Sequence, residues 1–343
     1  MRSSPTKSPR IFGLFDKRVE GDDCLMELAR LRFRQTGLGA EVHAGTLEEL
    51  KWVLRFRPSP ETPVMVHLAR EFSLMDQHHR EKIGEFASHF ADQVNGLVVH
   101  DHPELATRPA EYLRAARDLA SRLEKIAGCP MVFIEYAAGV EPVVFVEFFA
   151  SLREAPCISA CIDIGHVGIR AARIAYTNLH PGEDICALKT HTHRIPHVIS
   201  DIETAVRTGL PTVLQMISRI GALGKPLHFH LHDAHPLSTF SYFGVSDHLS
   251  FLAEISIGFE YRGNRSLPLM YGPEGLDQIA KTTFAAIGYQ AASFTLEIHP
   301  TAEQLSLGDA APLFSHWTDK SNAERMNHWL DVLRRNQELL ARA

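Results

Sequence analysis

The sequence lacks any apolar run that approaches the roughly 20 residues needed to cross a bilayer. Its first residues, MRSSPTKSPR, are polar and have no apolar centre, so we expect no secretory leader and a flexible tail over residues 1–10. Repeats of solenoid period and low-complexity segments are also missing. These absences favour an ordinary globular chain without a membrane partner.

Basic residues are fewer than acidic residues, and cysteine is scarce. The chain has 35 Lys and Arg against 41 Asp and Glu, a net charge of −6, so its composition gives no sign of a nucleic-acid or anionic-membrane partner. A local basic groove is still compatible with that balance. The 5 cysteines are odd in number and show no C-x-x-C spacing, which fits reduced thiols in a cytoplasmic protein.

Histidine, by contrast, is abundant, with 20 residues. The stretch LHFHLHDAH, residues 227–235, places four histidines and an aspartate among apolar residues. Because histidine is the commonest metal ligand and proton carrier in proteins, the location of this excess is the main clue to function.

Apolar segments of strand length alternate with amphipathic segments of helix length along the whole chain. This alternation predicts a parallel sheet, and eight successive units predict one closed (β/α)8 TIM barrel over residues 11–343, with a doubly wound open sheet as the alternative. The expected strands are 11–15, 39–44, 63–69, 96–102, 131–137, 159–165, 227–233 and 293–298, and the helix expected after the sixth strand covers 201–224.

Two connections, 167–200 and 234–272, are too long for barrel turns, and we expect long loops there. Both follow the carboxyl ends of strands, the end at which barrels place their chemistry. The second connection carries aromatic residues that we expect to cover a ligand or to pack against another subunit in a homodimer. These are Tyr242, Phe243, Phe259 and Tyr261.

Side chains alternate between the two faces of a strand. In LHFHLH the apolar Leu227, Phe229 and Leu231 share the face that must meet the helices, so His228, His230 and His232 point into the barrel. The same alternation points ionisable side chains inward from all but the first of the expected strands. The others are Glu41, His43, His67, His100, Glu135, Asp163 and Glu297.

Buried carboxylates and imidazoles are unfavourable unless they are paired or bind a cation. A ring of them is best explained by a divalent metal, and oxygen and nitrogen ligands without thiolate suit Zn, Mn, Mg or Co. We expect His43 and the deeper His228 to be structural. A loop cluster, His191, His193 and His197, is expected to be solvated rather than a second site.

Four short motifs in order resemble the xylose isomerase-like superfamily of barrels, from the second strand to the eighth. That superfamily includes sugar isomerases, ketose 3-epimerases, inosose dehydratases and endonuclease IV. The motifs are FIEYAAG with Glu135, CIDIGH with Asp163 and His166, HLHDAH with His230, and TLEIHP with Glu297.

The resemblance implies that Glu135, Asp163, His230 and Glu297 hold one metal. In the epimerase branch the two glutamates would also be the catalytic acid and base on opposite faces of the substrate. His166 would touch substrate or a further metal, and His67, His100 and His232 are expected to bind substrate.

Other details resemble endonuclease IV, in which extra histidines hold a second zinc and a D-x-H pair holds a third. Here His67 and His100 stand at the matching places, but Asp247 and His248 are adjacent with no residue between them. A further metal site could therefore use His67, His100, His166, Asp247 and His248.

The leading hypothesis from the sequence is a metal-dependent sugar isomerase or epimerase that acts on a small sugar or polyol through proton transfer by the two glutamates. The alternatives are a multinuclear zinc phosphodiesterase like endonuclease IV, a barrel that binds a metabolite without turnover, and a lyase or dehydratase.

Overall fold

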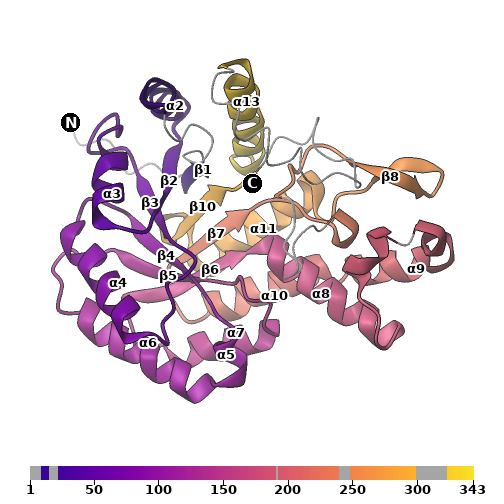
Figure 1. Cartoon of the computed structure of the whole chain (residues 1–343), viewed down its shortest axis with the longest axis horizontal. Coiled ribbons are helices and arrows are strands. Elements are labelled where there is room, and N and C mark those ends of the chain that lie inside the picture. Colours follow the sequence, from indigo (N-terminus) through magenta and orange to yellow (C-terminus); the bar gives the residue numbers. More distant parts are fainter. Residues whose placement is uncertain (1–8, 15–21, 191, 239–247, 299–322) are drawn as a thin grey trace.

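The computed structural model describes residues 9–14, 22–190, 192–238, 248–298 and 323–343. Eight parallel strands close into a barrel in the order β1-β10-β7-β6-β5-β4-β3-β2 (Figure 1). This confirms the predicted (β/α)8 TIM barrel. The strands are β1 (Arg10–Leu14), β2 (Gly39–Ala44), β3 (Val64–Leu68), β4 (Gly96–His100), β5 (Met131–Glu135), β6 (Ile158–Asp163), β7 (Leu227–Leu231) and β10 (Ala292–Leu296).

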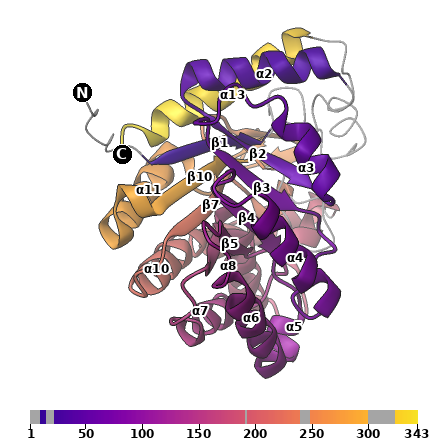
Figure 2. The same cartoon turned by 90° about the vertical axis from the view of Figure 1, so that its left-hand side faces the viewer.

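Helices surround the strands and bury their outward apolar side chains (Figures 1 and 2). In Figure 2, α2 and α13 lie side by side, and Gln337 of α13 donates a hydrogen bond to the carbonyl of Thr36. Among the described residues no helix combines the length and apolarity that a bilayer crossing needs. The helices are α2 (Asp23–Thr36), α3 (Leu47–Leu54), α4 (Gln77–His89), α5 (Glu104–Thr107), α6 (Pro109–Leu123), α7 (Pro142–Ser151), α8 (Ile164–Leu179), α9 (Ile195–Val206), α10 (Gly209–Gly221), α11 (Gly272–Ile287) and α13 (Ala323–Leu340).

The barrel interior is layered. An apolar floor fills the lower part, and polar side chains occupy the levels above it. Strand register sets these levels, because His43 pairs with His67 on β2 and β3 and Asp163 pairs with His230 on β6 and β7. The floor consists of Phe12, Met65, Val98, Phe133 and Cys161.

The expectation of a long loop over 167–200 is wrong. Helix α8 begins at Ile164, directly after β6, because the side chain of Asp163 caps it by accepting the backbone N–H of His166 at 2.8 Å. The helix expected over 201–224 is also two helices, the end of α9 and all of α10. The connection between β6 and β7 is long, but most of it is helical.

The connection after β7 contains an antiparallel hairpin, β8 (Ile255–Tyr261) and β9 (Asn264–Leu267), that packs near α9 (Figure 1). We call this hairpin with α9 the side lobe. Phe259 and Tyr261 are buried in its own apolar cluster, so they do not form the exposed surface expected from the sequence. Tyr242 and Phe243 lie outside the described residues.

The buried Asp233 fastens both ends of this connection to the barrel. Its backbone pairs with Leu249, and its carboxylate accepts backbone N–H groups of Ala234 at 2.7 Å, Met270 at 2.9 Å and Gly272 at 2.7 Å. One side chain therefore joins the end of β7 to the residues that lead into α11.

We expect Asp233→Asn to lower the free energy of unfolding by about 2 kcal/mol, because an amide NH2 group would face backbone donors that now share an ionised acceptor. Thermal unfolding with denaturant titration measures the change. The matched control is Asp277→Asn on α11, whose carboxylate bonds to the exposed Lys281, and it should cost less than about 0.5 kcal/mol. Equal losses in the two variants would contradict the fastening role.

Candidate metal centre

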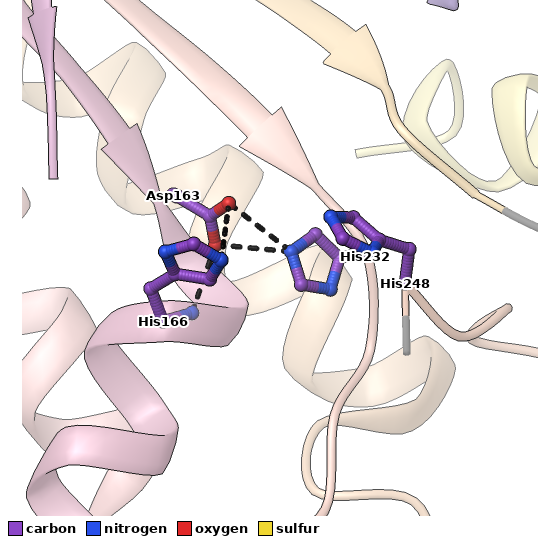
Figure 3. Close-up of side chains that lie close together, drawn as sticks. All are labelled: Asp163, His166, His232 and His248. Carbon is purple, nitrogen blue, oxygen red and sulfur yellow. Dashed lines mark hydrogen bonds and ion pairs between the residues drawn. The ribbon is translucent and has the colours of Figure 1, made fainter. Parts of the chain in front are cut away.

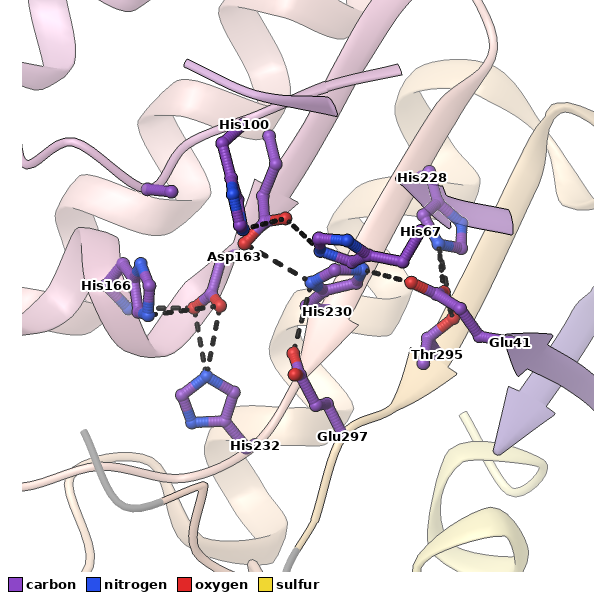
Figure 4. A network of polar contacts seen from close by, with 12 residues as sticks. Glu41, His67, His100, Asp163, His166, His228, His230, His232, Thr295 and Glu297 are labelled. Atoms are coloured by element: carbon purple, nitrogen blue, oxygen red, sulfur yellow. Dashed lines mark hydrogen bonds and ion pairs between the residues drawn. The ribbon is translucent and has the colours of Figure 1, made fainter. Parts of the chain in front are cut away.

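Alternation along the strands brings the predicted ligands together. The ligand atoms of Glu135, Asp163 and His230 lie within 4.8 Å of one another. Glu297 Oε2 is 3.1 Å from His230 Nδ1, and Glu135 Oε1 is 3.5 Å from the same nitrogen (Figure 4). The four residues that the resemblance implied as ligands thus form one cluster at the carboxyl ends of β5, β6, β7 and β10.

A second group joins Glu135 to His67 and His100. Glu135 Oε2 is 2.8 Å from His67 Nε2 and 3.4 Å from His100 Nε2. The sequence interpretation placed both histidines in substrate binding or in a further metal site, and the structure places them against a carboxylate of the first group.

A third group contains Asp163, His166, His232 and His248 (Figure 3). His232 Nε2 is 3.0 Å from Asp163 Oδ1, and His166 Nε2 is 3.5 Å from Asp163 Oδ2. His232 is completely buried and does not line the cavity described below, so the structure favours a ligand role over the predicted substrate contact. Asp247, the other expected member, lies outside the described residues.

Two carboxylates link these groups into a row. Glu135 belongs to the first and second groups, and Asp163 belongs to the first and third. A carboxylate has two oxygens and can serve two neighbouring groups, so Glu135 and Asp163 would each help to hold the cations of the groups to which they belong.

In His67 and His232, a hydrogen bond from one ring nitrogen to the backbone determines that the other nitrogen faces a carboxylate. His67 Nδ1 lies 2.9 Å from the carbonyl oxygen of Leu68, and His232 Nδ1 lies 3.0 Å from that of Asp233. A carbonyl only accepts, so each Nδ1 carries the hydrogen and donates it. The Nε2 lone pair of each neutral ring therefore points at a carboxylate, which is the arrangement of histidines that bind metals.

His230 is oriented in the same way, but its donating nitrogen bonds to a carboxylate instead of a backbone carbonyl. Its Nε2 lies 3.0 Å from Glu41 Oε1, and Glu41 is also the acceptor for His228 Nε2 at 3.1 Å and for the hydroxyl of Thr295 (Figure 4). His230 Nδ1 makes no hydrogen bond within the described part of the chain and faces Glu135 and Glu297.

A lone pair that faces a carboxylate needs a proton on the nitrogen or a cation between the two atoms. In the absence of a cation, burial opposes charge on His67 and His232, yet Glu135 and Asp163 respectively raise the pKa of these rings. Burial also opposes charge on His230, but Cys161, Glu41 and the other carboxylates raise its pKa well above the usual value. The rings of His67 and His230 are stacked 5.5 Å apart, so charging both is unfavourable.

The residues fit divalent cations. Ligands of a tetrahedral cation lie about 3.4 Å apart, and the nitrogen-to-oxygen distances in the three groups run from 2.8 to 3.5 Å. Burial lowers the pKa of His100 and of His248 to about 4, which leaves both rings neutral with a lone pair to offer. Neither ring nitrogen of His166 makes a hydrogen bond among the described residues.

A thiolate ligand is less well placed. Cys161 lies near His228 and His230, but the two ring nitrogens of His228 already lie 2.8 Å from the Ser293 hydroxyl and 3.1 Å from Glu41 Oε2. The three groups described above offer imidazole and carboxylate, a donor set that suits Zn, Mn, Co or Mg without selecting one.

The sequence interpretation missed the role of Glu41. Alternation correctly pointed Glu41 inward, but its partners His230, His228 and Thr295 come from β7 and β10, across the barrel. Burial opposes ionisation, but His230 and His228 lower the pKa of Glu41 well below its usual value. Glu41 is therefore an anion beneath the candidate ligands, and only the closed barrel reveals it.

Beside the centre lies a cavity of about 870 Å³. His43, expected to be structural, lines it and stacks on His67 with ring centroids 4.8 Å apart. The expectation of solvated histidines fits His193 and His197, which are exposed, whereas His191 lies outside the described residues. The candidate ligands that reach the cavity are His67, His100, Glu135, His166, His248 and Glu297.

No protein-family model matches this chain, and no curated protein sequence matches it. Among solved structures, the carboxyl transferase domain of Rhizobium etli pyruvate carboxylase with pyruvate is similar at a TM-score of 0.33 and 11% sequence identity. The alignment covers 97% of this chain and 49% of that chain, so this chain spans about half the length of that structure. The likeness is too weak to extend that enzyme's chemistry to this chain.

Proposed function

We propose that this chain is a multinuclear divalent-metal enzyme that hydrolyses phosphoesters. The observation that supports the proposal is the sharing of Glu135 and Asp163 between neighbouring groups of metal-ligating side chains. Bound divalent cations would supply Lewis acidity and a water of lowered pKa, both of which promote phosphoester hydrolysis.

The residues of the chain would hold and orient the reacting groups. Glu135 and Asp163 would hold neighbouring positions in the row. The hydrogen-bond acceptors behind His67, His230 and His232 keep the opposite ring nitrogens aimed at the row. His166 lines the cavity and has both ring nitrogens without a hydrogen bond in the described structure, so it is placed to meet a cation or a substrate oxygen.

A metal-dependent isomerase or epimerase is the second candidate. It is favoured by the placement of Glu135 and Glu297 on the same His230 nitrogen, at 3.5 and 3.1 Å. However, an acid/base glutamate needs an oxygen free for the substrate proton, and Glu135 Oε2 is taken by His67 and His100. For this reason we place hydrolysis first.

We also propose, on the four motifs and the clustering of their acidic and histidine residues, that the barrel is a member of the xylose isomerase-like superfamily. The motif residues Glu135, Asp163, His230 and Glu297 come together in the structure as that resemblance requires.

Elemental analysis of protein purified without a histidine tag or added metal tests the proposal. We expect two or three Zn, Mn or Co ions per chain, and hydrolysis of bis(p-nitrophenyl) phosphate that is lost on chelation and restored by metal. One ion per chain, with no phosphoester hydrolysis and with turnover of a ketose, would instead favour the isomerase.

A further inference from the structure

The cavity beside the candidate metal centre is lined by two kinds of side chain. One kind consists of candidate ligands, including His100, Glu135 and Glu297. The other kind is apolar and comes from α2 and α3, as Met26, Trp52 and Val53. A ligand that fills the cavity therefore meets both metal-binding groups and an apolar, partly aromatic surface.

Trp52 belongs to a short capped helix beside the cavity. Helix α3 starts at the end of β2 with a capping box, in which Thr46 and Glu49 bond to each other's backbone N–H groups at 3.1 Å. Trp52 is half-buried and packs edge-on against Phe56, with ring centroids 5.0 Å apart. The capped helix and this ring contact place the indole along the cavity.

Size and charge both favour a small ligand. A volume of about 870 Å³ lies within the range of small-molecule pockets. Among the residues that the structure describes, the exposed charged side chains along the cavity are Glu49, Arg70 and Glu71, which have no excess of positive charge. Binding to a nucleic-acid duplex rests on many Lys and Arg contacts to phosphates, and the described part of the rim has one arginine.

We propose that the substrate is a small phosphoester whose organic group carries a flat ring, with the phosphoryl group at the metal centre and the ring against Trp52. This inference rests on the proposed function only for the phosphoryl end. The ring end is argued from the cavity wall, because aromatic faces attract flat rings beyond the effect of buried area alone.

The test compares phenylphosphonate with methylphosphonate, two probes that cannot be hydrolysed and differ only in the organic group. Calorimetric titration of the metal-loaded full chain, at a pH where both are dianions, should give a dissociation constant at least about tenfold lower for phenylphosphonate. Trp52→Leu should reduce that ratio to about twofold, and Trp52→Phe, which keeps a ring and checks that folding is intact, should preserve most of it.

The matched control is Tyr289→Leu, which removes a half-exposed ring just before β10, at the end of the barrel opposite the cavity. It should leave the ratio unchanged. Equal binding of the two probes, binding of neither, or a ratio that survives Trp52→Leu would overturn the inference. Cleavage of a duplex oligonucleotide with an abasic site at a higher kcat/KM than bis(p-nitrophenyl) phosphate would overturn it as well.

The two proposals fail separately. Selective binding of phenylphosphonate that depends on Trp52, without hydrolysis of any phosphoester, would retain the ring-binding part of this inference and remove the proposed function. Hydrolysis of bis(p-nitrophenyl) phosphate with no effect of Trp52→Leu on the binding ratio would do the reverse.

Discussion

Replacing Glu135 by Gln is expected to reduce the bound metal by at least one ion per chain and to lower phosphoester hydrolysis by about 1000-fold. The reason is that Glu135 is shared by two groups of candidate ligands, with Oε1 near His230 and Oε2 between His67 and His100. An amide presents only one oxygen and a neutral charge to the same neighbours. Elemental analysis and bis(p-nitrophenyl) phosphate hydrolysis measure the two effects.

The fold of this variant should survive, for a reason visible in the hydrogen bonds. His67 donates through Nδ1 to a backbone carbonyl, so its Nε2 can accept a hydrogen bond from the new amide NH2 group. In chelator, Glu135→Gln should therefore unfold at a temperature no lower than the parent protein. The control is Glu338→Gln on the exposed side of α13, which should change neither metal content nor activity. Unchanged metal content in Glu135→Gln would disprove the site assignment.

The second large effect, on metal affinity, is expected at Glu41, which is buried and does not line the cavity. Glu41→Gln should weaken metal binding by about 10- to 100-fold, the usual result of changing a carboxylate that orients a metal-binding histidine. The carboxylate accepts from His230, His228 and Thr295 together, and an amide cannot accept from all three without turning an N–H group against a donor. His230 would then lose its fixed orientation.

Competition with a coloured zinc chelator measures this affinity. The rise in Tm on adding metal separates a loss of His230 orientation from a general loss of barrel stability. This rise should be smaller in Glu41→Gln than in the parent protein. If Glu41 served only the packing of the barrel, Tm would fall equally with and without metal, and the metal-induced rise would equal that of the parent protein.

The fold could be predicted from the sequence because strand and helix patterns alternate along the chain. Within LHFHLH, the alternation of side chains places Phe229 on the face toward the helices and His228 and His230 on the face toward the barrel interior. The helix after β6 was missed because Asp163 was interpreted only as a ligand. Asp163 is also the N-cap of α8, and an aspartate three residues before His166 is a recognisable start signal for a helix.

The candidate site was predictable to the extent that it depends on position within one strand. Glu135, Asp163 and His230 each stand near the carboxyl end of a strand with inward parity, and closure of the barrel brings them together. The role of Glu41 depends on contacts across the barrel, so local patterns did not reveal it. His248 was named only through the resemblance to endonuclease IV, because its position depends on the path of a long connection.

The fastening of the β7–α11 connection by Asp233 would let the β8–β9 hairpin vary in length. The connection leaves and re-enters the barrel at this one aspartate, and the hairpin packs in an apolar cluster separate from the main core. Because the entropy of closing a loop grows only slowly with length, insertions at the hairpin turn, between Tyr261 and Asn264, would change barrel stability little. Evolution could therefore alter the outer surface of the hairpin while His248, on the same connection, and the other candidate ligands keep their places.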